Sequence, residues 1–337
     1  MRGKVKQILA RSLIYFKADK LGRWLNRRKL LVVMYHGVTS RSYDPPVWTQ
    51  LPESIFRAHI EFLSRYYFPV SLRQVMAAIA GRQPLPDRAV LLTFDDGLRN
   101  NATVVWPILR QFNVPATIFL TVDYIGTDQL LWVDELYFYI VEAARRGINI
   151  KLQGSSLAQE LFQRGDIWGA YVEIVEAYKR TDRDIRTERL DLLEAEVPLN
   201  RTKLNEDFGL LHWDQVRAMH LGGLIDFGVH TATHVILTQM APVDVHREIF
   251  HAKETIEGNL NQSVEAFCYP NGRPDIDFGE EHKAILRQAG YHCAFSTKCA
   301  LFDPATDDAF SISRVPAGND ASSTPEIMKW NCAGFPG

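Results

Sequence analysis

Ala89-Val90-Leu91-Leu92-Thr93-Phe94-Asp95-Asp96-Gly97 is the stretch that decides both the class of fold and the position of the functional site. Its apolar run predicts a buried strand that breaks at Gly97, with two adjacent carboxylates, Asp95 and Asp96, where the strand ends. Neighbouring carboxylates repel each other, so the pair is costly unless the two share a cation or have different roles. The stretch therefore predicts a functional site at the end of this strand.

A second motif, His230-Thr231-Ala232-Thr233-His234, provides further ligands for such a cation. Two histidines with three residues between them face the same way on a helical turn, and in a loop they can still close on one ion. One aspartate and two histidines suit Zn²⁺ or a similar divalent metal, with positions left open for water. The second aspartate is then free to take a proton from that water. The two motifs together predict a hydrolase.

Strands and helices alternate along most of the chain. This alternation predicts a parallel sheet or barrel, whose active site gathers at the carboxyl ends of the strands. Between about residues 127 and 209 helix formers and charge predominate and no strand pattern is evident, which predicts a helical insertion. The expected strands are 30–35, 89–94, 116–121, 224–229, 264–268, 292–295 and 310–315. The candidate site residues that directly follow such strands are His36, Asp95, Asp96, His230 and Tyr269.

Residues 1–29 form a strongly basic arm. Ten Lys and Arg stand against Asp19 alone, a charge of +9, so the rest of the chain carries −11 and the whole chain −2. Apolar residues recur in the arm at helical spacing. A basic amphipathic helix of this kind can lie on an anionic membrane surface, and the alternative is a helix packed on the barrel with a solvated basic face.

The rest of the composition narrows the class of protein. No segment reaches the roughly 18–20 apolar residues of a membrane span, and Lys and Arg interrupt each stretch that could serve as a secretory signal. The four cysteines lack CxxC spacing, which favours a reduced compartment. The sequence predicts a cytoplasmic protein, with peripheral contact at the inner membrane surface left open by the basic arm. The acidic remainder argues against a nucleic-acid partner.

With Tyr269-Pro270-Asn271-Gly272 as a third motif, the chain resembles the polysaccharide deacetylases, which are the family 4 carbohydrate esterases with the nodulation-protein deacetylase (NodB-homology) domain. Asp-Asp and HxxxH pairs are each common on solvated surfaces. The occurrence of both motifs in this order, each at the end of a strand, is a specific signal for the family. The resemblance covers about residues 30–126 and 210–316. It implies a distorted (β/α)₇-type barrel, with one domain over 30–337 and the helical insertion at about 127–209.

The resemblance also implies roles for individual residues. Carried over by position, Asp95 is the general base, and Asp96, His230 and His234 hold a divalent metal. Zn²⁺ is the expected ion, with Co²⁺, Ni²⁺, Mn²⁺ and Fe²⁺ as alternatives. The backbone N–H of Asn271, which follows Tyr269 and Pro270, is implied as the donor to the oxyanion of the tetrahedral intermediate.

Two departures from the family pattern need a replacement residue. Cys268 stands where many members have the arginine that holds the catalytic aspartate. Arg314, in Ser311-Ile312-Ser313-Arg314, is the candidate replacement, and a purely structural ion pair is its alternative role.

The second departure concerns the general acid. No histidine follows Val315, where most members carry a Leu-x-His motif. His36 in Met34-Tyr35-His36-Gly37 is the candidate substitute, because this early motif resembles that of rearranged deacetylases acting on poly-N-acetylglucosamine. An imidazole titrates near the working pH, which suits the role, and a packed core histidine is the alternative.

The function expected from these observations is a metal-dependent hydrolase that removes the N-acetyl group from an amino sugar and releases acetate. The expected substrate is an N-acetylglucosamine-type polysaccharide or a lipid-linked saccharide. Two alternatives remain: a deformylase of a lipid-linked amino sugar, and a carbohydrate-binding barrel without catalysis.

Overall fold

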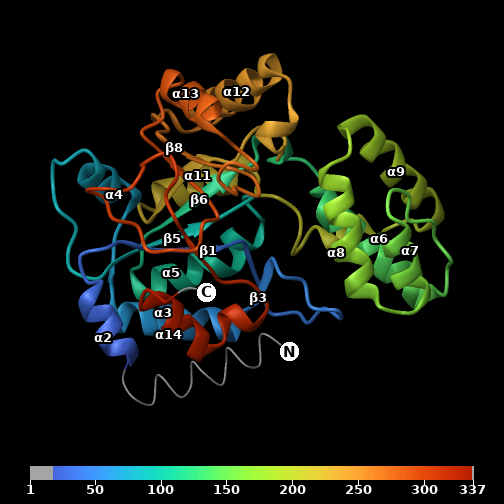
Figure 1. Cartoon of the computed structure of the whole chain (residues 1–337), viewed down its shortest axis with the longest axis horizontal. Coiled ribbons are helices and arrows are strands. Elements are labelled where there is room, and N and C mark those ends of the chain that lie inside the picture. Colours follow the sequence, from blue (N-terminus) through green and yellow to red (C-terminus); the bar gives the residue numbers. More distant parts are fainter. Residues whose placement is uncertain (1–17, 336–337) are drawn as a thin grey trace. The chain divides into compact units, whose positions relative to one another are not determined.

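The computed structural model describes residues 18–335 (Figure 1). The chain divides into two compact units. The first, called here the sheet unit, comprises Met1–Ser42, Pro46–Thr127 and Leu210–Gly337. The second, called the helical unit, comprises Tyr43–Pro45 and Asp128–Gly209.

The sheet unit is built on an eight-stranded sheet in which every strand pair is parallel. The strand order is β10-β1-β5-β6-β7-β8-β9, with β4 paired to β5. The predicted α/β fold is confirmed, and the sheet curls into a half-barrel. The strands are β1 (Leu31–Tyr35), β4 (Phe68–Pro69), β5 (Ala89–Phe94), β6 (Ala116–Leu120), β7 (Ile225–Val229), β8 (Ala266–Cys268), β9 (Cys293–Phe295) and β10 (Val315–Pro316).

The two ends of the sheet approach each other through one segment. Ile312 forms an isolated parallel bridge with Phe295 of β9, and Val315 of β10 then pairs with Val33 of β1. The continuous strand expected over 310–315 is therefore wrong. The chain bends between Ile312 and Val315 so that it contacts both edges, which narrows the gap in the barrel.

The register of the strands determines which residues leave the sheet together. Tyr35 of β1 is level with Phe94 of β5, so His36 and Asp95 follow at adjacent strand ends. The amide of Asp95 donates to the carbonyl of Tyr35 at 3.0 Å, which continues the pairing past the last strand residue. Parallel strands therefore deliver the polar residues that follow them to one edge of the sheet.

Apolar side chains on the strands form the core of the half-barrel. Val32, Leu91, Phe119 and Phe295 are all fully buried in one cluster, as expected for parallel strands covered on both faces. The helices of the sheet unit are α2 (Ala18–Leu25), α3 (Glu53–Tyr66), α4 (Leu72–Ile79), α5 (Trp106–Phe112), α11 (Trp213–Leu221), α12 (Pro242–Leu260), α13 (Glu280–Gln288) and α14 (Pro325–Cys332). The shorter elements are β2 (Gly37–Thr39), β3 (Gln50–Pro52), η1 (Asn101–Val105), η2 (Val122–Tyr124), η3 (Leu237–Gln239) and η4 (Ala321–Ser323).

The basic arm is described only in part. Residues 1–17 lie outside the described residues, and α2 covers Ala18–Leu25 of the predicted amphipathic helix. Among residues 18–335, no helix combines the length and the apolar character needed to cross a bilayer.

The helical unit has a core of its own. Leu136, Ile140, Ile174 and Tyr178 are among its buried residues. The side chains of Ser155, Asp166, Asp182 and Asn200 cap the amino ends of four of its helices. The helices are α6 (Trp132–Arg146), α7 (Ser156–Gln163), α8 (Ile167–Lys179), α9 (Arg183–Glu196) and α10 (Arg201–Leu204).

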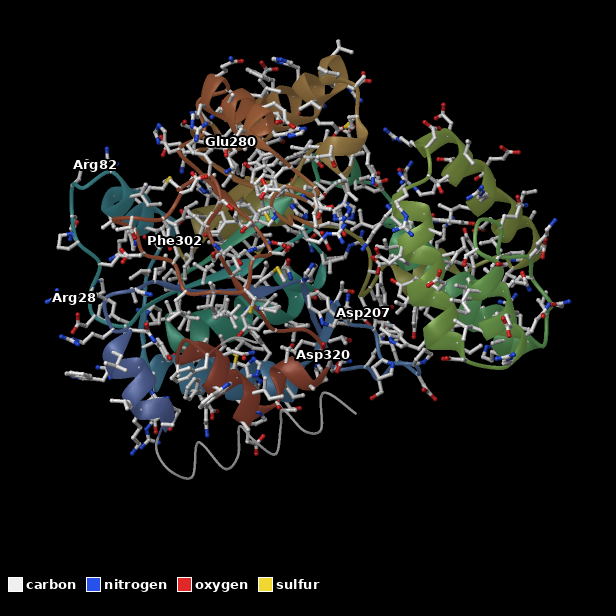
Figure 2. The ribbon with its side chains drawn as sticks, in the orientation of Figure 1. Arg28, Arg82, Asp207, Glu280, Phe302 and Asp320 are labelled. Carbon is white, nitrogen blue, oxygen red and sulfur yellow. The ribbon has the colours of Figure 1, made fainter. Side chains whose placement is uncertain are left out.

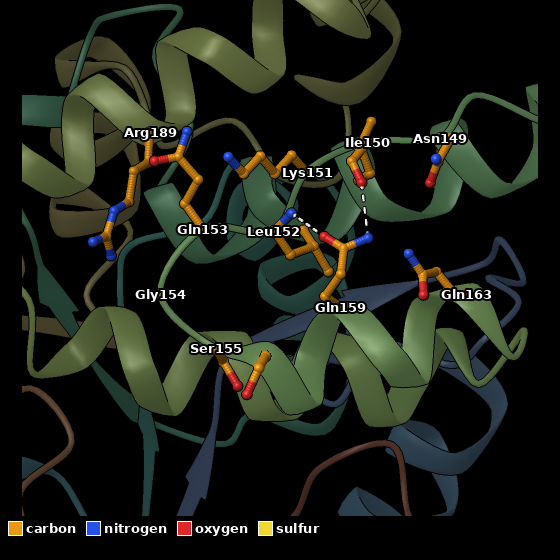
Figure 3. A pocket seen from close by; sticks show the side chains of 11 residues that line it. Asn149, Ile150, Lys151, Leu152, Gln153, Gly154, Ser155, Gln159, Gln163 and Arg189 are labelled. Atoms are coloured by element: carbon orange, nitrogen blue, oxygen red, sulfur yellow. Dashed lines mark hydrogen bonds between the residues drawn. The ribbon is translucent and has the colours of Figure 1, made fainter.

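A hollow of about 720 Å³ lies on the helical unit (Figure 3). Gln159 is one of the residues that line it, and its side chain accepts from the amide of Leu152 at 2.8 Å and donates to the carbonyl of Ile150 at 3.2 Å. None of the residues that line the hollow belongs to the Asp/His motifs.

The chain leaves the sheet unit and returns to it at neighbouring positions. The amide of Gly126, just before the helical unit, donates to the carbonyl of Leu211, just after it, at 2.9 Å. The bridge between Leu98 and Leu210 fixes the returning chain beside the end of β5.

Candidate active site

The structure brings both motifs to one place. Asp96, His230 and His234 each present a ligand atom, and these three atoms lie within 4.8 Å of one another. Asp95 lies beside them on the same strand end. Asp95, Asp96 and His230 are almost fully buried, whereas the side chain of His234 is 14% exposed and marks the side from which a substrate can approach.

Arg314 holds Asp95 with two hydrogen bonds. Its Nη1 donates to Oδ1 of Asp95 at 2.7 Å, and its Nη2 donates to Oδ2 at 2.9 Å. Burial alone raises the pKa of Asp95, but the Arg314 guanidinium together with His230 and His36 brings that pKa below its ordinary range. A fully buried fork–fork pair of this kind keeps the carboxylate ionised and fixes the plane in which its oxygens lie.

A backbone carbonyl and a hydroxyl group hold the Arg314 guanidinium beside the end of β5. Its Nε donates to the carbonyl of Ser296 at 2.9 Å, and its Nη1 also donates to Oγ1 of Thr93 at 3.3 Å. Cys268, which stands where the family arginine is expected, instead places its Sγ 3.5 Å from Oδ1 of Asp95. The guanidinium therefore reaches Asp95 from a different segment of the chain.

Asp96 is arranged differently from its neighbour. Its φ of 74° lies in the left-handed region, which turns its side chain away from that of Asp95. Oδ1 of Asp96 lies 3.4 Å from Nε2 of His230 and 3.2 Å from Nε2 of His234. This oxygen is buried and accepts no hydrogen bond among the described residues. An unpaired buried carboxylate oxygen is costly, so the site is incomplete without a cation.

A hydrogen bond on the far side of the ring sets the tautomer of His230. Nδ1 of His230 lies 2.8 Å from the carbonyl oxygen of Cys268, which can only accept, so Nδ1 carries the proton. In the neutral ring the lone pair of Nε2 then faces Oδ1 of Asp96. Carbonyl contacts of this kind orient the histidine ligands of metals. The donor set of two imidazoles and one carboxylate fits a divalent metal of the Zn²⁺ type.

A second group, Asp95, His230 and Cys268, also brings ligand atoms within the same distance. Both oxygens of Asp95 already accept from Arg314, and burial raises the pKa of the Cys268 thiol, which keeps it protonated. A thiol must lose its proton to bind metal. The group containing Asp96 and His234 is therefore the better candidate metal site.

His36 lies at the end of β1 in a partly buried position. Burial lowers its pKa, whereas the nearby carboxylates of Asp96 and Asp95 raise it. Its ring meets the indole of Trp48 edge-on with the ring centres 5.2 Å apart. The imidazole is thus placed between an aromatic ring and the two carboxylates.

The third motif follows β8 directly and begins with a buried tyrosine. Tyr269 is buried, stacks on Phe278 at 3.6 Å and donates its hydroxyl to the carbonyl of Phe310. The Tyr269 ring therefore packs in the core, and the assignment of Tyr269 to the substrate and oxyanion group stays a prediction. Asn271 has a φ of 57°, and its N–H has no acceptor within residues 18–335. That amide stays a candidate oxyanion donor, with Pro270 setting the turn before it.

Glu248 of α12 is a residue that sequence reasoning missed. Its carboxylate is buried and accepts from the amides of Ala232 and Thr233 and from Oγ1 of Thr233, each at 2.8 Å. These groups lie between the two histidines, in a loop that bends through positive φ at Thr231 and His234. Glu248 therefore holds the turn that brings the histidines together. A glutamate on a helix carries no sequence signal for this role.

Comparison with known proteins shows that these motifs lie within a region that matches a known family. The sequence model of one family, described as polysaccharide deacetylase, matches residues 82–294. That range includes Asp95, Asp96 and both histidines of the second motif. His36 and Arg314 lie outside it.

Two curated relatives match shorter stretches. A putative polysaccharide deacetylase of Bacillus subtilis (strain 168), YxkH, is 27% identical over 139 residues, which is 40% of this chain and 47% of that protein. The poly-beta-1,6-N-acetyl-D-glucosamine N-deacetylase of Escherichia coli (strain K12) is 32% identical over 109 residues, which is 32% of this chain and 16% of that protein. The matches thus span less than half the length of each relative.

Solved structures resemble the chain over most of its length. The Streptococcus pyogenes deacetylase PplD in complex with acetate gives a TM-score of 0.58 at 17% identity, covering 90% of this chain and 98% of that one. IcaB from Ammonifex degensii gives a TM-score of 0.58 at 18% identity, covering 90% and 97%. At these identities the likeness shows the fold.

Proposed function

The chain belongs to the polysaccharide deacetylase family, and we propose that it hydrolyses the acetamide of an N-acetylated amino sugar with the help of a divalent metal. The observation that carries the proposal is the buried Asp95–Arg314 pair beside the unsatisfied oxygen of Asp96. One carboxylate is held ready by a guanidinium, and the other presents a buried oxygen that accepts no hydrogen bond among the described residues. This division of roles between adjacent aspartates is what metal-assisted hydrolysis requires.

Asp96, His230 and His234 would hold the metal. When bound, a divalent metal supplies a Lewis acid that polarises a carbonyl and lowers the pKa of water. Zn²⁺ is the ion proposed from the mixed nitrogen and oxygen donor set. The partly exposed His234 side chain leaves one side of the cluster accessible to a sugar.

Asp95 is the proposed general base. Arg314 fixes its orientation, so one oxygen can take the proton of the attacking water without a rotation of the carboxylate. The amide of Asn271 is the proposed donor to the oxyanion that forms on the substrate carbonyl.

His36 is the proposed general acid, in line with the early Met34-Tyr35-His36 motif. Burial has the larger effect on its pKa and lowers it. The imidazole is therefore neutral near pH 7. The proton that Asp95 takes from the attacking water would have to pass to His36, which would then give it to the leaving amine.

The proposed substrate class is an N-acetylglucosamine-type polysaccharide or a lipid-linked saccharide. The name of the Escherichia coli relative supports the polymer, because it describes an enzyme acting on poly-beta-1,6-N-acetyl-D-glucosamine. Removal of a formyl group is the second candidate activity, since formyl and acetyl differ by one methyl and use the same chemistry.

The test is acetate release from N-acetylglucosamine oligomers. Metal is first removed with a chelator, and Zn²⁺ or Co²⁺ is then added back. We expect release that depends on metal and is abolished in Asp95→Asn, while Asp214→Asn, a change in an exposed ion pair on α11, leaves it intact. Release that persists without metal or in Asp95→Asn contradicts the mechanism. A formylated lipid-linked sugar tested in parallel separates the two candidate activities.

A further inference from the structure

Helix α2, the described part of the basic arm, exposes apolar side chains and buries charged ones, which is the reverse of what a helix packed only on the barrel would do. Its most exposed apolar residues are Leu21, Trp24 and Leu25, at 57%, 59% and 61%. Its charged residues Asp19 and Arg23 are only 6% and 8% exposed. A surface helix normally buries its apolar side and exposes its charges.

Specific contacts fix this orientation. Arg23 donates to Asp19 at 2.8 Å, and its guanidinium lies 5.1 Å from the centre of the Tyr66 ring of α3. Gly22 lies against Ala333, where a Cβ would stand 2.7 Å from the Ala333 carbonyl oxygen. Because only glycine allows this approach, α2 cannot rotate to turn Trp24 inward without losing both contacts.

Cations surround the exposed apolar residues. Lys20, Arg28 and Lys29 are exposed, and the guanidinium of Arg27 lies 5.0 Å from the centre of the Trp24 ring. Figure 2 shows Arg28 at the margin of the sheet unit near α2. We call this surface the α2 face, made of Lys20, Leu21, Trp24, Leu25, Arg28 and Lys29.

Backbone hydrogen bonds link Arg27 to a segment that carries a further exposed aromatic residue. The amide of Arg88 donates to the carbonyl of Arg27 at 2.5 Å, and the amide of Phe68 donates to the carbonyl of Arg88 at 2.8 Å. The Phe68 side chain is 54% exposed. These bonds place a fourth exposed large apolar residue on the segment beside Arg27.

We propose that the α2 face is a docking surface for an anionic lipid bilayer. Tryptophan and leucine on one side with lysine and arginine around them are the groups that enter the headgroup region, where the cations meet lipid phosphates. Residues 1–17 add five further Lys and Arg and no acidic residue. Charge of this sign matches the anionic cytoplasmic leaflet, where each cation strengthens binding.

The proposal does not depend on the deacetylase chemistry, because it concerns binding alone. It predicts that the full chain binds vesicles of phosphatidylcholine with 30–40% phosphatidylglycerol and binds pure phosphatidylcholine at least about tenfold more weakly, since each cation near the surface contributes about fivefold. Flotation of the full chain with each vesicle type measures this. Binding that weakens as salt is raised is part of the expected result.

The decisive variant replaces the three exposed apolar residues of α2: Leu21→Ser, Trp24→Ser and Leu25→Ser. The matched control makes the same change at three exposed apolar residues elsewhere on the sheet unit: Leu221→Ser, Val243→Ser and Ile276→Ser. We expect the first triple variant to lose vesicle binding and the control to keep it. A third variant, Lys20→Glu with Arg28→Glu and Lys29→Glu, should lose binding to anionic vesicles while the apolar residues remain.

Three results overturn the proposal. The first is a full chain that does not bind anionic vesicles, and the second is equal loss of binding in the control triple variant. The third is a concentration-dependent dimer that the α2 triple variant abolishes without vesicle binding, which assigns the face to a second copy of the chain. Acetate release from a soluble oligomer, measured on the same variants, keeps failure of the docking surface distinct from failure of the active site.

Discussion

Arg314 and Asp95 are 219 positions apart in the chain, and their side chains form a buried pair with two hydrogen bonds of 2.7 and 2.9 Å. Arg314 supplies the guanidinium that the third motif lacks, since Cys268 stands in the position of the family arginine. Cys268 cannot hold a carboxylate as an arginine does, so the guanidinium comes from the segment that joins the two edges of the sheet. The catalytic proposal depends on this contact.

Arg314→Lys should therefore slow turnover without loss of metal. Lysine keeps the positive charge but cannot make the fork, so Asp95 loses its fixed orientation. We expect a fall in kcat of about 10- to 100-fold. Arg145→Lys is the control, because the Nε and Nη2 of Arg145 both donate to Glu142 on α6 of the helical unit. Wild-type kcat in Arg314→Lys would limit Arg314 to a structural role.

His230→Ala should separate metal binding from proton transfer. Its Nε2 lone pair faces Asp96, so its removal takes one of three ligands and should release the metal. Asp95→Asn should retain it, since Asp95 is not one of the three proposed ligands and both of its oxygens accept from Arg314. Metal content after gel filtration distinguishes the two variants. Equal metal content in both would contradict the assignment of ligands.

Glu248→Gln should weaken metal binding although Glu248 is not a ligand. A glutamine amide has one acceptor oxygen, and its NH₂ group meets the donors that the carboxylate now binds. We expect the dissociation constant of the metal to rise by about 10- to 100-fold. Glu254→Gln on the same helix is the control, since that residue is exposed. Restored turnover at high metal concentration would identify a positioning role.

His36→Asn should affect amides more than activated esters. An amine leaving group needs a proton, whereas 4-nitrophenolate leaves without one. We expect a fall of about 10²- to 10⁴-fold in deacetylation of the amino sugar and a much smaller fall with 4-nitrophenyl acetate. Equal losses on both substrates would mean that His36 orients the substrate and does not act as the acid.

His59 should make the free energy of unfolding depend on pH. It is buried between the Tyr35 hydroxyl and the Ser323 carbonyl, and burial lowers its pKa, although the Ser323 hydrogen bond opposes this. Below about pH 6.5 the unfolded chain gains a proton that the folded chain resists, so stability falls as pH decreases. The contribution of the buried neutral His59 to the free energy of unfolding is fully present above that pH.

Urea unfolding at pH 7.5 and at lower pH checks this. The slope of the free energy of unfolding against pH that one histidine can cause approaches about 1.4 kcal/mol per pH unit. We expect this slope to be smaller in His59→Gln. The exposed His292→Gln serves as control. An unchanged slope in His59→Gln would mean that His59 is not the source.

Parts of this structure follow from sequence pattern because they are local. The run 89–94 is apolar because parallel strands are covered on both faces, and the charged residues follow where such a strand ends. The approach of Asp96 to His230 and His234 follows from the parallel topology, which brings strand ends to one edge.

Other parts could not be read from sequence, since they depend on long-range contacts or on the rotation of a helix. The bend between Ile312 and Val315 arises because one segment serves both sheet edges, and no local propensity encodes it. Leu21 and Leu25 fit an inward stripe by spacing, yet Gly22 and Arg23 take the inner side. Tyr269 pairs with Phe278 in the core, which a motif position does not reveal.

The bond between Gly126 and Leu211 closes the sheet unit across the point where the helical unit departs. The half-barrel therefore needs only a short turn at this position, whatever length of chain lies between the two residues. A change in the length of this segment would therefore leave the strand order and the spacing of the Asp and His motifs across the sheet unaltered. The junction is therefore a position at which a protein engineer can shorten or replace the segment 128–209, provided that its partner segment Tyr43–Pro45 is redesigned with it.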